Sequence, residues 1–398
     1  MKNLRNQPED WSFLICVREN VYGKKECQEL IKFTTESTIT ELKGKDMEKW
    51  MKCYVGTNSL RGSKGIYTLE VNTQNGKMRE VSTVEADDSA YLYVSEKRKC
   101  LYAVMESLEY KGVPGGGVAA YRIEDNKLSF LNSRYAYGGW PCHVIADEEK
   151  DSLLVSVFRN GLLVVYGINQ DGSIGEERRV EHHQEPNGRM SHIHASMPTP
   201  DGKYIAVADC GLDYVYLYDA KTYQKVFEWK APEDSGPRQL RFSPDGKYLY
   251  MVSELSCQIF VFEYQPDCKD MLRNVQVIST RREDGYDREN YTSALQMHPS
   301  GRYLLAGNRG HNSIVVYEVD KKTGLLMLKG HTMLAGDFCR EFCFVPDGSM
   351  LIVGIQHTDV VQTFFFDENK GILKWSGQEI VIPSPSCVIM GCEGYSAK

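Results

Sequence analysis

The sequence predicts an all-β protein, a seven-bladed β-propeller. A twelve-residue motif occurs six times, at 95–106, 147–158, 199–210, 243–254, 298–309 and 345–356. Each copy has a turn-forming centre, Pro-Asp-Gly or a polar substitute, and lies among short apolar runs that read as strands. Four such strands can be placed in each repeat of about 50 residues, which is the pattern of a propeller blade.

The two ends of the chain carry the halves of a seventh blade. Residues 51–58 resemble the strand that follows the turn, and residues 383–391 resemble the strand that precedes it. Pairing the two halves closes the ring and leaves no sheet edge free. We therefore expect residues 53–57 to lie beside residues 386–390 in one sheet.

The repeat also sets the domain organisation. Residues 51–398 form the propeller, and residues 1–50 form a short N-terminal extension of unknown role. Within this extension, residues 24–37 are compatible with a short amphipathic helix.

Composition excludes several classes of function. The formal net charge of −7 argues against a nucleic-acid partner. The longest apolar runs, such as 161–167, are far shorter than the roughly 18 residues of a membrane span, so no membrane association is expected. The first residues lack the pattern of a secretory signal, and the 12 cysteines contain no CxxC pair. We expect reduced thiols and a cytoplasmic protein.

Chemistry is expected where the hairpins of the blades are open. There the start of the strand before each turn lies beside the end of the strand after it, and all the open ends meet at one mouth of the central channel. Charged and imidazole side chains occupy these positions: His194, Arg238 and Arg340 at strand starts, and Glu106, Glu254 and Arg309 at strand ends. An unpaired buried charge is costly, so these side chains need partners. Either they form salt bridges between blades, or they converge on a binding site for an anion.

Two further histidines, His192 and His311, lie close to these residues in the sequence. His192 and His194 are two residues apart and share a face if the segment is extended, and His311 follows Arg309 in NRGHNS. The pair could bind a metal, serve a structural purpose, or bind or activate a substrate. No third ligand stands at useful spacing, so we expect neither a metal nor another cofactor.

Several strings in blade order carry a family resemblance. They include YVGTNSLRGSKGIYTLEVN (54–72), GGWPCHV (138–144), HIHASM (192–197), GPRQLRFSPDGKYLYMVSELS (236–256), NRGHNSIVVYEVD (308–320) and CREFCFVPDG (339–348). Over about residues 52–392 the chain resembles the lactonase family of seven-bladed propellers. At two places it departs from the family strings: Gln239 follows the arginine of GPR, and FRNG (158–161) replaces a string that contains Asn-Tyr.

The resemblance implies metal-independent chemistry on a small anionic lactone. It implies catalytic roles for His194, Arg238, Glu254 and Arg309, and we take His192, Glu106, Arg340 and His311 as substrate-binding candidates. The function expected first is hydrolysis of a sugar lactone, with 6-phosphogluconolactone as the leading substrate. A cycloisomerase that lactonizes carboxymuconate and a non-catalytic binding scaffold are the alternatives. The oligomeric state is left open.

Overall fold

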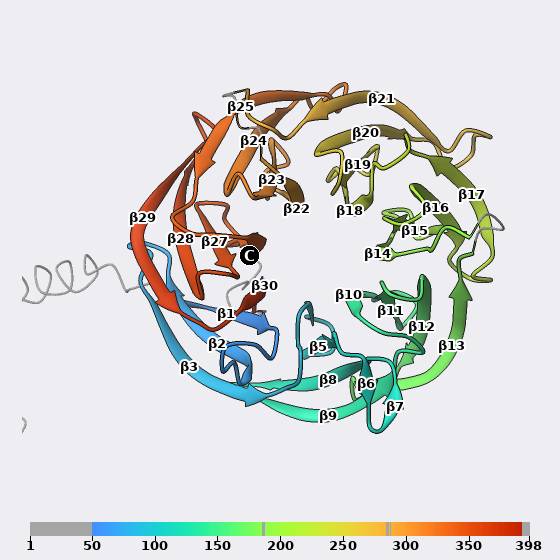
Figure 1. Ribbon diagram of the computed structural model, residues 1–398, viewed down its shortest axis with the longest axis horizontal. Coiled ribbons are helices and arrows are strands. Elements are labelled where there is room, and N and C mark those ends of the chain that lie inside the picture. The colour runs from blue at the N-terminus through green and yellow to red at the C-terminus, as the bar shows by residue number, and fades with distance from the viewer. Residues whose placement is uncertain (1–49, 185–187, 284–285, 287, 392–398) are drawn as a thin grey trace, which may run out of the picture. The chain divides into compact units, whose positions relative to one another are not determined.

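Strands arranged as a ring make up the propeller (Figure 1). The computed structural model describes residues 50–184, 188–283, 286 and 288–391. These residues form seven main sheets of four strands each, as the sequence predicts. The first described strand begins at Trp50, and the helix expected at 24–37 lies outside the described residues. No helix in the described ranges has the length and apolar character needed to cross a bilayer.

Each blade is an antiparallel meander that runs from the ring axis outward. Blade 1 contains β4 (Leu92–Ser95), β5 (Cys100–Met105), β8 (Gly117–Glu124) and β9 (Lys127–Tyr135). A small hairpin of β6 (Glu109–Tyr110) and β7 (Val113–Pro114) is inserted between β5 and β8. Blade 2 contains β10 (Pro141–Asp147), β11 (Ser152–Val157), β12 (Leu162–Ile168) and β13 (Ile174–His182). Blade 3 contains β14 (Ile193–Pro198), β15 (Tyr204–Asp209), β16 (Tyr214–Asp219) and β17 (Lys225–Lys230).

The remaining blades repeat this order. Blade 4 contains β18 (Pro237–Phe242), β19 (Tyr248–Ser253), β20 (Gln258–Tyr264) and β21 (Leu272–Ser279). Blade 5 contains β22 (Tyr291–Met297), β23 (Tyr303–Arg309), β24 (Ser313–Val319) and β25 (Leu326–Met333). Blade 6 contains β26 (Cys339–Phe344), β27 (Met350–Ile355), β28 (Val360–Asp367) and β29 (Ile372–Val381).

Blade 7 joins the two ends of the repeat. Its order is β30 (Pro385–Met390), β1 (Trp50–Thr57), β2 (Gly65–Asn72) and β3 (Met78–Glu85). The antiparallel register pairs Cys53 with Met390 and Val55 with Val388. The predicted pairing of residues 53–57 with 386–390 is therefore confirmed, and the innermost strand of the ring's last blade comes from the C-terminal part of the propeller.

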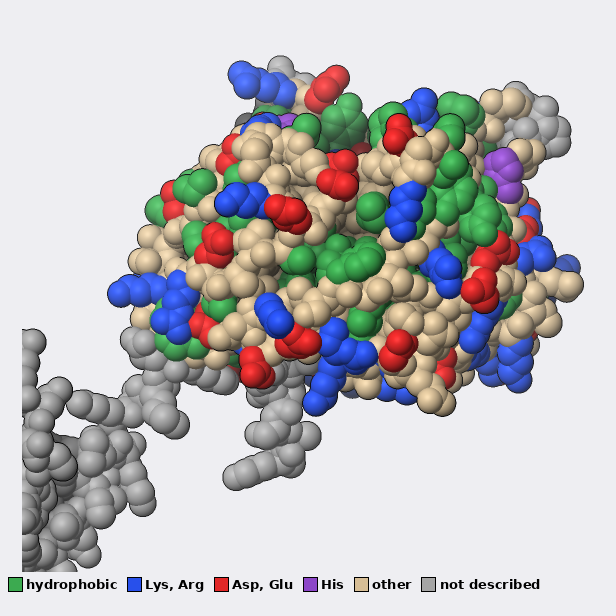
Figure 2. Space-filling view, turned by 90° about the horizontal axis from the view of Figure 1, so that it is seen from below, with side chains coloured by type: hydrophobic (Ala, Val, Ile, Leu, Met, Phe, Trp, Pro, Cys, Tyr) green, Lys and Arg blue, Asp and Glu red, His purple; other side chains and the backbone are tan. Residues whose placement is uncertain are grey.

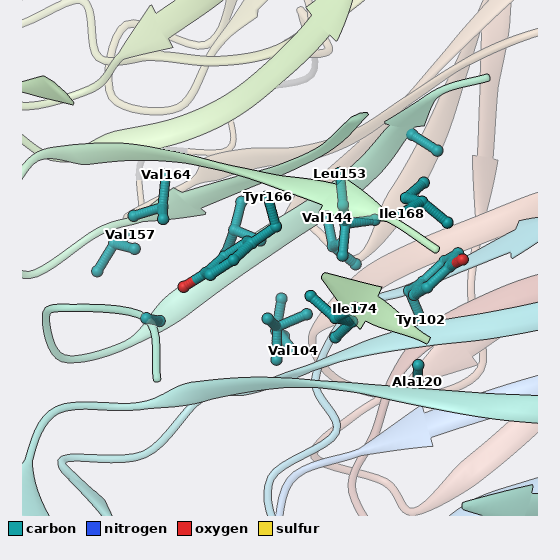
Figure 3. Packing of buried hydrophobic residues seen from close by; sticks show 14 of the residues in the cluster. Tyr102, Val104, Ala120, Val144, Leu153, Val157, Val164, Tyr166, Ile168 and Ile174 are labelled. Atoms are coloured by element: carbon teal, nitrogen blue, oxygen red, sulfur yellow. The ribbon is translucent and has the colours of Figure 1, made fainter. Parts of the chain in front are cut away.

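The hydrophobic core lies between neighbouring blades. Figure 3 shows one such cluster, which contains Tyr102 and Ala120 of blade 1 together with Ile168 and Ile174 of blade 2. The Tyr102 hydroxyl donates a 2.9 Å hydrogen bond to the carbonyl oxygen of Gly172, so the ring is buried without leaving a polar atom unsatisfied. Each fully buried large apolar side chain contributes roughly 1.5–3 kcal/mol, which holds the blades against one another.

A β-bulge recurs near the start of the innermost strands. The register with the second strand breaks in β10, β14, β18, β22 and β26, and again in β30. The residues that have no partner in the register at these breaks include Cys142, His194, Arg238, Ser293, Arg340 and Ser386. A bulge re-aims a side chain and ends regular pairing, so these positions can depart from the alternation of the strand.

Candidate active site

Two repeated backbone features place the candidate residues. His194, Arg238 and Arg340 stand on the bulges of β14, β18 and β26. Glu254 directly follows β19, and its N–H donates a 2.7 Å hydrogen bond to the carbonyl oxygen of Gly236 at the open end of the hairpin. The N–H of Glu106 donates the equivalent bond, of 2.8 Å, to Asp88.

The centre of the site is the Glu254 carboxylate. Its Oε2 accepts a 2.9 Å hydrogen bond from Nε of Arg238, and its Oε1 lies 2.9 Å from Nη2 of Arg309. His194 Nε2 lies 4.0 Å from Oε2. These four residues, here the Glu254 cluster, come from blades 3, 4 and 5, and they are the four catalytic candidates of the sequence.

Backbone acceptors fix the two arginines further. Arg238 donates a 2.6 Å hydrogen bond from Nη1 to the carbonyl oxygen of Ser293, and Arg309 donates a 3.2 Å bond from Nη2 to that of Thr292. The guanidinium carbon of Arg309 also lies 5.0 Å from the ring centre of Phe338. Both arginines are thus held by backbone carbonyl groups of β22 as well as by Glu254.

Burial and neighbouring charges determine the protonation states. Burial raises the pKa of Glu254, but the charges of Arg309 and Arg238 outweigh it and hold the pKa below its ordinary value. Burial, together with the charges of Arg238, Arg340 and Arg309, lowers the pKa of His194 well below its ordinary value. Burial also lowers the pKa of Arg309 to about 10. At neutral pH the cluster holds an ionised carboxylate, two guanidinium cations and a neutral imidazole.

A second group, the Glu106 cluster, comprises Asn58, Glu106, Arg340 and Gln356. Arg340 Nη2 donates to both carboxylate oxygens of Glu106, at 2.8 and 3.1 Å. Asn58 Oδ1 accepts a 2.7 Å hydrogen bond from Gln356 and a 3.3 Å bond from Nη1 of Arg340. Arg340 lowers the pKa of His194 by its charge, so the two clusters act on one another electrostatically.

His192 lies beside the Glu254 cluster but takes no part in its ion pairs. Its ring stacks on Phe158 with centres 4.5 Å apart, and its Nδ1 lies 2.9 Å from the Phe158 carbonyl oxygen. Phe158 also contacts the ring of His194 in an edge-to-face arrangement, with the ring centres 5.9 Å apart. Phe158 therefore separates the two histidines, although they are only two residues apart.

The structure does not bring His311 into either cluster. Its Nδ1 lies 2.7 Å from the Ser313 hydroxyl, and its backbone N–H donates to Asn290. Its ring contacts are with Tyr286 and His331. The expected substrate-binding role of His311 stays a prediction, and its neighbour Arg309 is the residue that reaches Glu254.

The described residues contain no group of three His, Cys, Asp or Glu side chains placed to hold a metal ion. Metal independence stays a prediction. Cys142, on the bulge of β10, is not a ready nucleophile, because burial raises the pKa of its thiol and keeps it protonated.

The structure adds Phe158, Asn58 and Gln356 to the residues at the site. All three directly follow the second strand of their blades, at the position that Glu254 occupies in blade 4. The sequence repeat places them at this position too, but an aromatic ring and two amides carry no charge and were not among the predicted site residues.

The arrangement is suited to carbonyl chemistry. A neutral imidazole can accept a proton from water, and two buried guanidinium groups can stabilise an oxyanion or hold an anionic group of a substrate. Glu254 neutralises part of their charge and orients both. His194 Nδ1 and Arg309 Nε are buried and have no hydrogen-bond partner among the described residues.

Comparison with known proteins agrees with the fold. A family model described as "Lactonase, 7-bladed beta-propeller" matches residues 52–390. A 6-phosphogluconolactonase of Bacillus subtilis is 30% identical over 344 residues, which cover 84% of this chain and 97% of the relative. A 6-phosphogluconolactonase of Formosa agariphila is 28% identical over 347 residues, covering 82% and 95%.

A solved structure shares the architecture. The periplasmic gluconolactonase PpgL of Pseudomonas aeruginosa superposes with a TM-score of 0.81 at 26% sequence identity. The match covers 87% of this chain and all of that one (100%).

Proposed function

Because this chain belongs to the seven-bladed β-propeller lactonase family, a family of lactone-hydrolysing enzymes, we propose that it hydrolyses 6-phosphogluconolactone to 6-phosphogluconate. The names of two relatives, both 6-phosphogluconolactonases, support this substrate. The observation that carries the proposal is the Glu254 carboxylate bridging Arg238 and Arg309, with the His194 imidazole 4.0 Å away.

In the proposed reaction, His194 acts as the general base. It accepts a proton from a water molecule while the water oxygen attacks the lactone carbonyl carbon. The low pKa of His194 keeps the imidazole neutral and available. Base catalysis of this kind contributes roughly 10²–10⁴-fold.

Arg309 and Arg238 stabilise the tetrahedral oxyanion. Each donor to such an oxyanion is worth about 2.7–4 kcal/mol. The bond from the carbonyl carbon to the ring oxygen then breaks, and the imidazolium of His194 returns its proton to that oxygen. The product carboxylic acid ionises, so one proton is released to solvent per turnover.

Proton release provides the assay. Purified protein is added to freshly prepared 6-phosphogluconolactone in weak buffer, and the rate is compared with spontaneous hydrolysis. D-glucono-δ-lactone is measured in parallel, and carboxymuconate is followed by the loss of its ultraviolet absorbance. We expect the largest enhancement with the phosphorylated lactone. No enhancement with it would overturn the proposed substrate, and lactonization of carboxymuconate would favour the cycloisomerase.

We also propose that the enzyme works in the cytoplasm. All nine cysteines among the described residues are free thiols, which supports a reducing compartment. Labelling of the thiols in intact and lysed cells tests this: labelling before lysis would contradict it.

A further inference from the structure

Beside Phe158, whose ring contacts His194, lies an unusual loop at residues 136–140. It joins β9 of blade 1 to β10 of blade 2. Tyr137 and Trp140 both adopt left-handed backbone conformations, with φ of 63° and 57°. Their side chains are 43% and 42% exposed. A large aromatic residue rarely takes this conformation, and a protein that holds two of them at its surface does so against local preference.

Hydrogen bonds from both neighbouring blades hold the loop in place. Trp140 donates its N–H to Ser107 at 3.0 Å and accepts a 3.0 Å bond from the N–H of Phe158. Gly139 donates to the Asn160 side chain at 2.8 Å and accepts a bond from the N–H of Arg159. The two aromatic side chains are therefore presented by a fixed backbone.

Arg159 completes this surface. Its guanidinium carbon lies 5.4 Å from the ring centre of Trp140, and its side chain is exposed. Arg238, Arg309 and Arg340 each pair with a glutamate, whereas Arg159 has no ion pair with a carboxylate in the described part of the chain. Its positive charge is thus available to an anion from outside.

A hollow of about 350 Å³ lies against Tyr137 and Arg159. Its walls include Leu108, Tyr137, Gly139, Arg159 and Asn160. Figure 2 views the ring from the side on which β9 lies and shows hydrophobic side chains gathered among charged ones. Apolar and aromatic walls with one cation and one amide suit a polar organic ligand that carries an acidic group.

Phe158 lies next to this surface and to the candidate active site. It precedes Arg159 in the turn after β11, and its ring contacts both His192 and His194. Arg159, which lines the hollow, is therefore one residue along the chain from a side chain that contacts the proposed general base.

We propose that Arg159, Trp140 and Tyr137 form an outer subsite that binds the acidic end of the substrate, a phosphate or carboxylate remote from the lactone carbonyl. Arg159 binds the anion, and the aromatic rings contact the carbon chain between it and the reacting group. This inference rests on the proposed function for the identity of the substrate.

Equilibrium binding tests the subsite without catalysis. Calorimetric titration uses 6-phosphogluconate, with a phosphate at its far end, glucarate, with a carboxylate there, and gluconate, with neither. Arg159→Ala should weaken binding of the ligand with the matching acidic end roughly tenfold and leave gluconate unchanged. Arg79→Ala is the matched control, because Arg79, on the outer strand β3 of blade 7, also lies over a tryptophan, Trp50, but pairs with Glu70 of β2.

The outcomes separate the two hypotheses. Weaker binding of 6-phosphogluconate alone identifies phosphate as the ligand of the subsite, and weaker binding of glucarate alone identifies carboxylate. Equal binding by the Arg159→Ala and Arg79→Ala variants for all three ligands overturns the subsite, even if the protein hydrolyses 6-phosphogluconolactone. Binding that depends on Arg159 in a protein that hydrolyses no lactone keeps the subsite and overturns the proposed function.

Kinetics supply a second measurement. With 6-phosphogluconolactone, Arg159→Ala should raise KM roughly tenfold and preserve kcat, because the residue binds ground state and transition state alike. With D-glucono-δ-lactone neither parameter should change. A fall in kcat with both substrates would instead indicate a general disturbance of the Phe158 turn and would count against the subsite.

Discussion

At the level of single residues, charge pairing dominates the candidate site. Glu254 is buried and ionised because two guanidinium groups offset its loss of hydration. The same pairing lowers the cost of burying Arg238 and Arg309. These ion pairs stabilise the fold whether or not the cluster carries the proposed chemistry, so a test must separate the two roles.

Glu254→Gln separates the two roles. The amide keeps the size of the side chain but leaves two buried cations without a counter-charge. We expect a loss of about 3 kcal/mol in unfolding free energy and a fall in kcat of about a hundredfold in the folded fraction. Denaturant unfolding and proton-release kinetics measure both. Glu228→Gln, at an exposed pair with Lys225 on β17, is the control. If activity follows only the folded fraction, the cluster is structural.

The pH profile tests the role of His194. A general base must be neutral to work, and burial with three nearby arginines lowers its pKa well below 6.5. The value of kcat/KM should therefore stay constant as pH falls through 6.5 and decline only in more acid solution. Substrate-saturation curves at several pH values provide the measurement. A decline centred at or above pH 6.5 would exclude His194 as the base.

At the level of elements, the open hairpin ends determine which side chains meet. The bulge of β18 places Arg238, and the bond from the Glu254 N–H to Gly236 closes the same hairpin. Gly236 has a φ of +68°, and an added Cβ would lie 2.9 Å from Leu255 Cγ and 3.2 Å from Cys210 Sγ. The turn thus depends on glycine both for its backbone and for space.

Gly236→Ala should consequently disturb Arg238 and Glu254 together. We expect a loss of about 1–3 kcal/mol in stability and an at least tenfold fall in kcat/KM. Gly377→Ala is a matched control, since Gly377 has a φ of +79° and nothing within 4 Å of an added Cβ. Thermal unfolding and lactone kinetics are compared for both. Equal effects on activity would show that the Gly236 turn has no special link to the site.

At the level of the whole molecule, closure of the ring depends on β30. This strand supplies the innermost position of blade 7 and pairs with β1. It also packs Val388 against a core cluster that contains residues of blade 6, such as Ile352 and Val361. Without it, β1 becomes an unpaired edge next to the ring axis.

A chain that ends at Ile382 should therefore lose cooperative unfolding and aggregate. The control ends at Gly391 and retains all of β30. We expect the control to keep a single thermal transition and the shorter chain to lose it, or to melt at least 10 °C lower. Calorimetry and size-exclusion chromatography report the result. A shorter chain with an unchanged transition would contradict closure through β30.

The sequence by itself determined the repeat, the number of blades, the closing pair of strands and the positions at which polar groups meet. These follow from local patterns, because a turn motif and the apolar runs around it specify one hairpin each. The positions of Glu254 and Arg238 could be predicted for the same reason: they lie at the two ends of one hairpin.

Only the tertiary structure decided which polar groups pair. Arg309 reaches Glu254 from blade 5, whereas its neighbour His311 turns to Ser313, and Arg340 of blade 6 joins Glu106 of blade 1. Phe158 separates His192 from His194 and leads to Arg159. These contacts join residues from different blades. They depend on closure of the ring and on the bulges that re-aim the inner side chains, and no local sequence pattern specifies either.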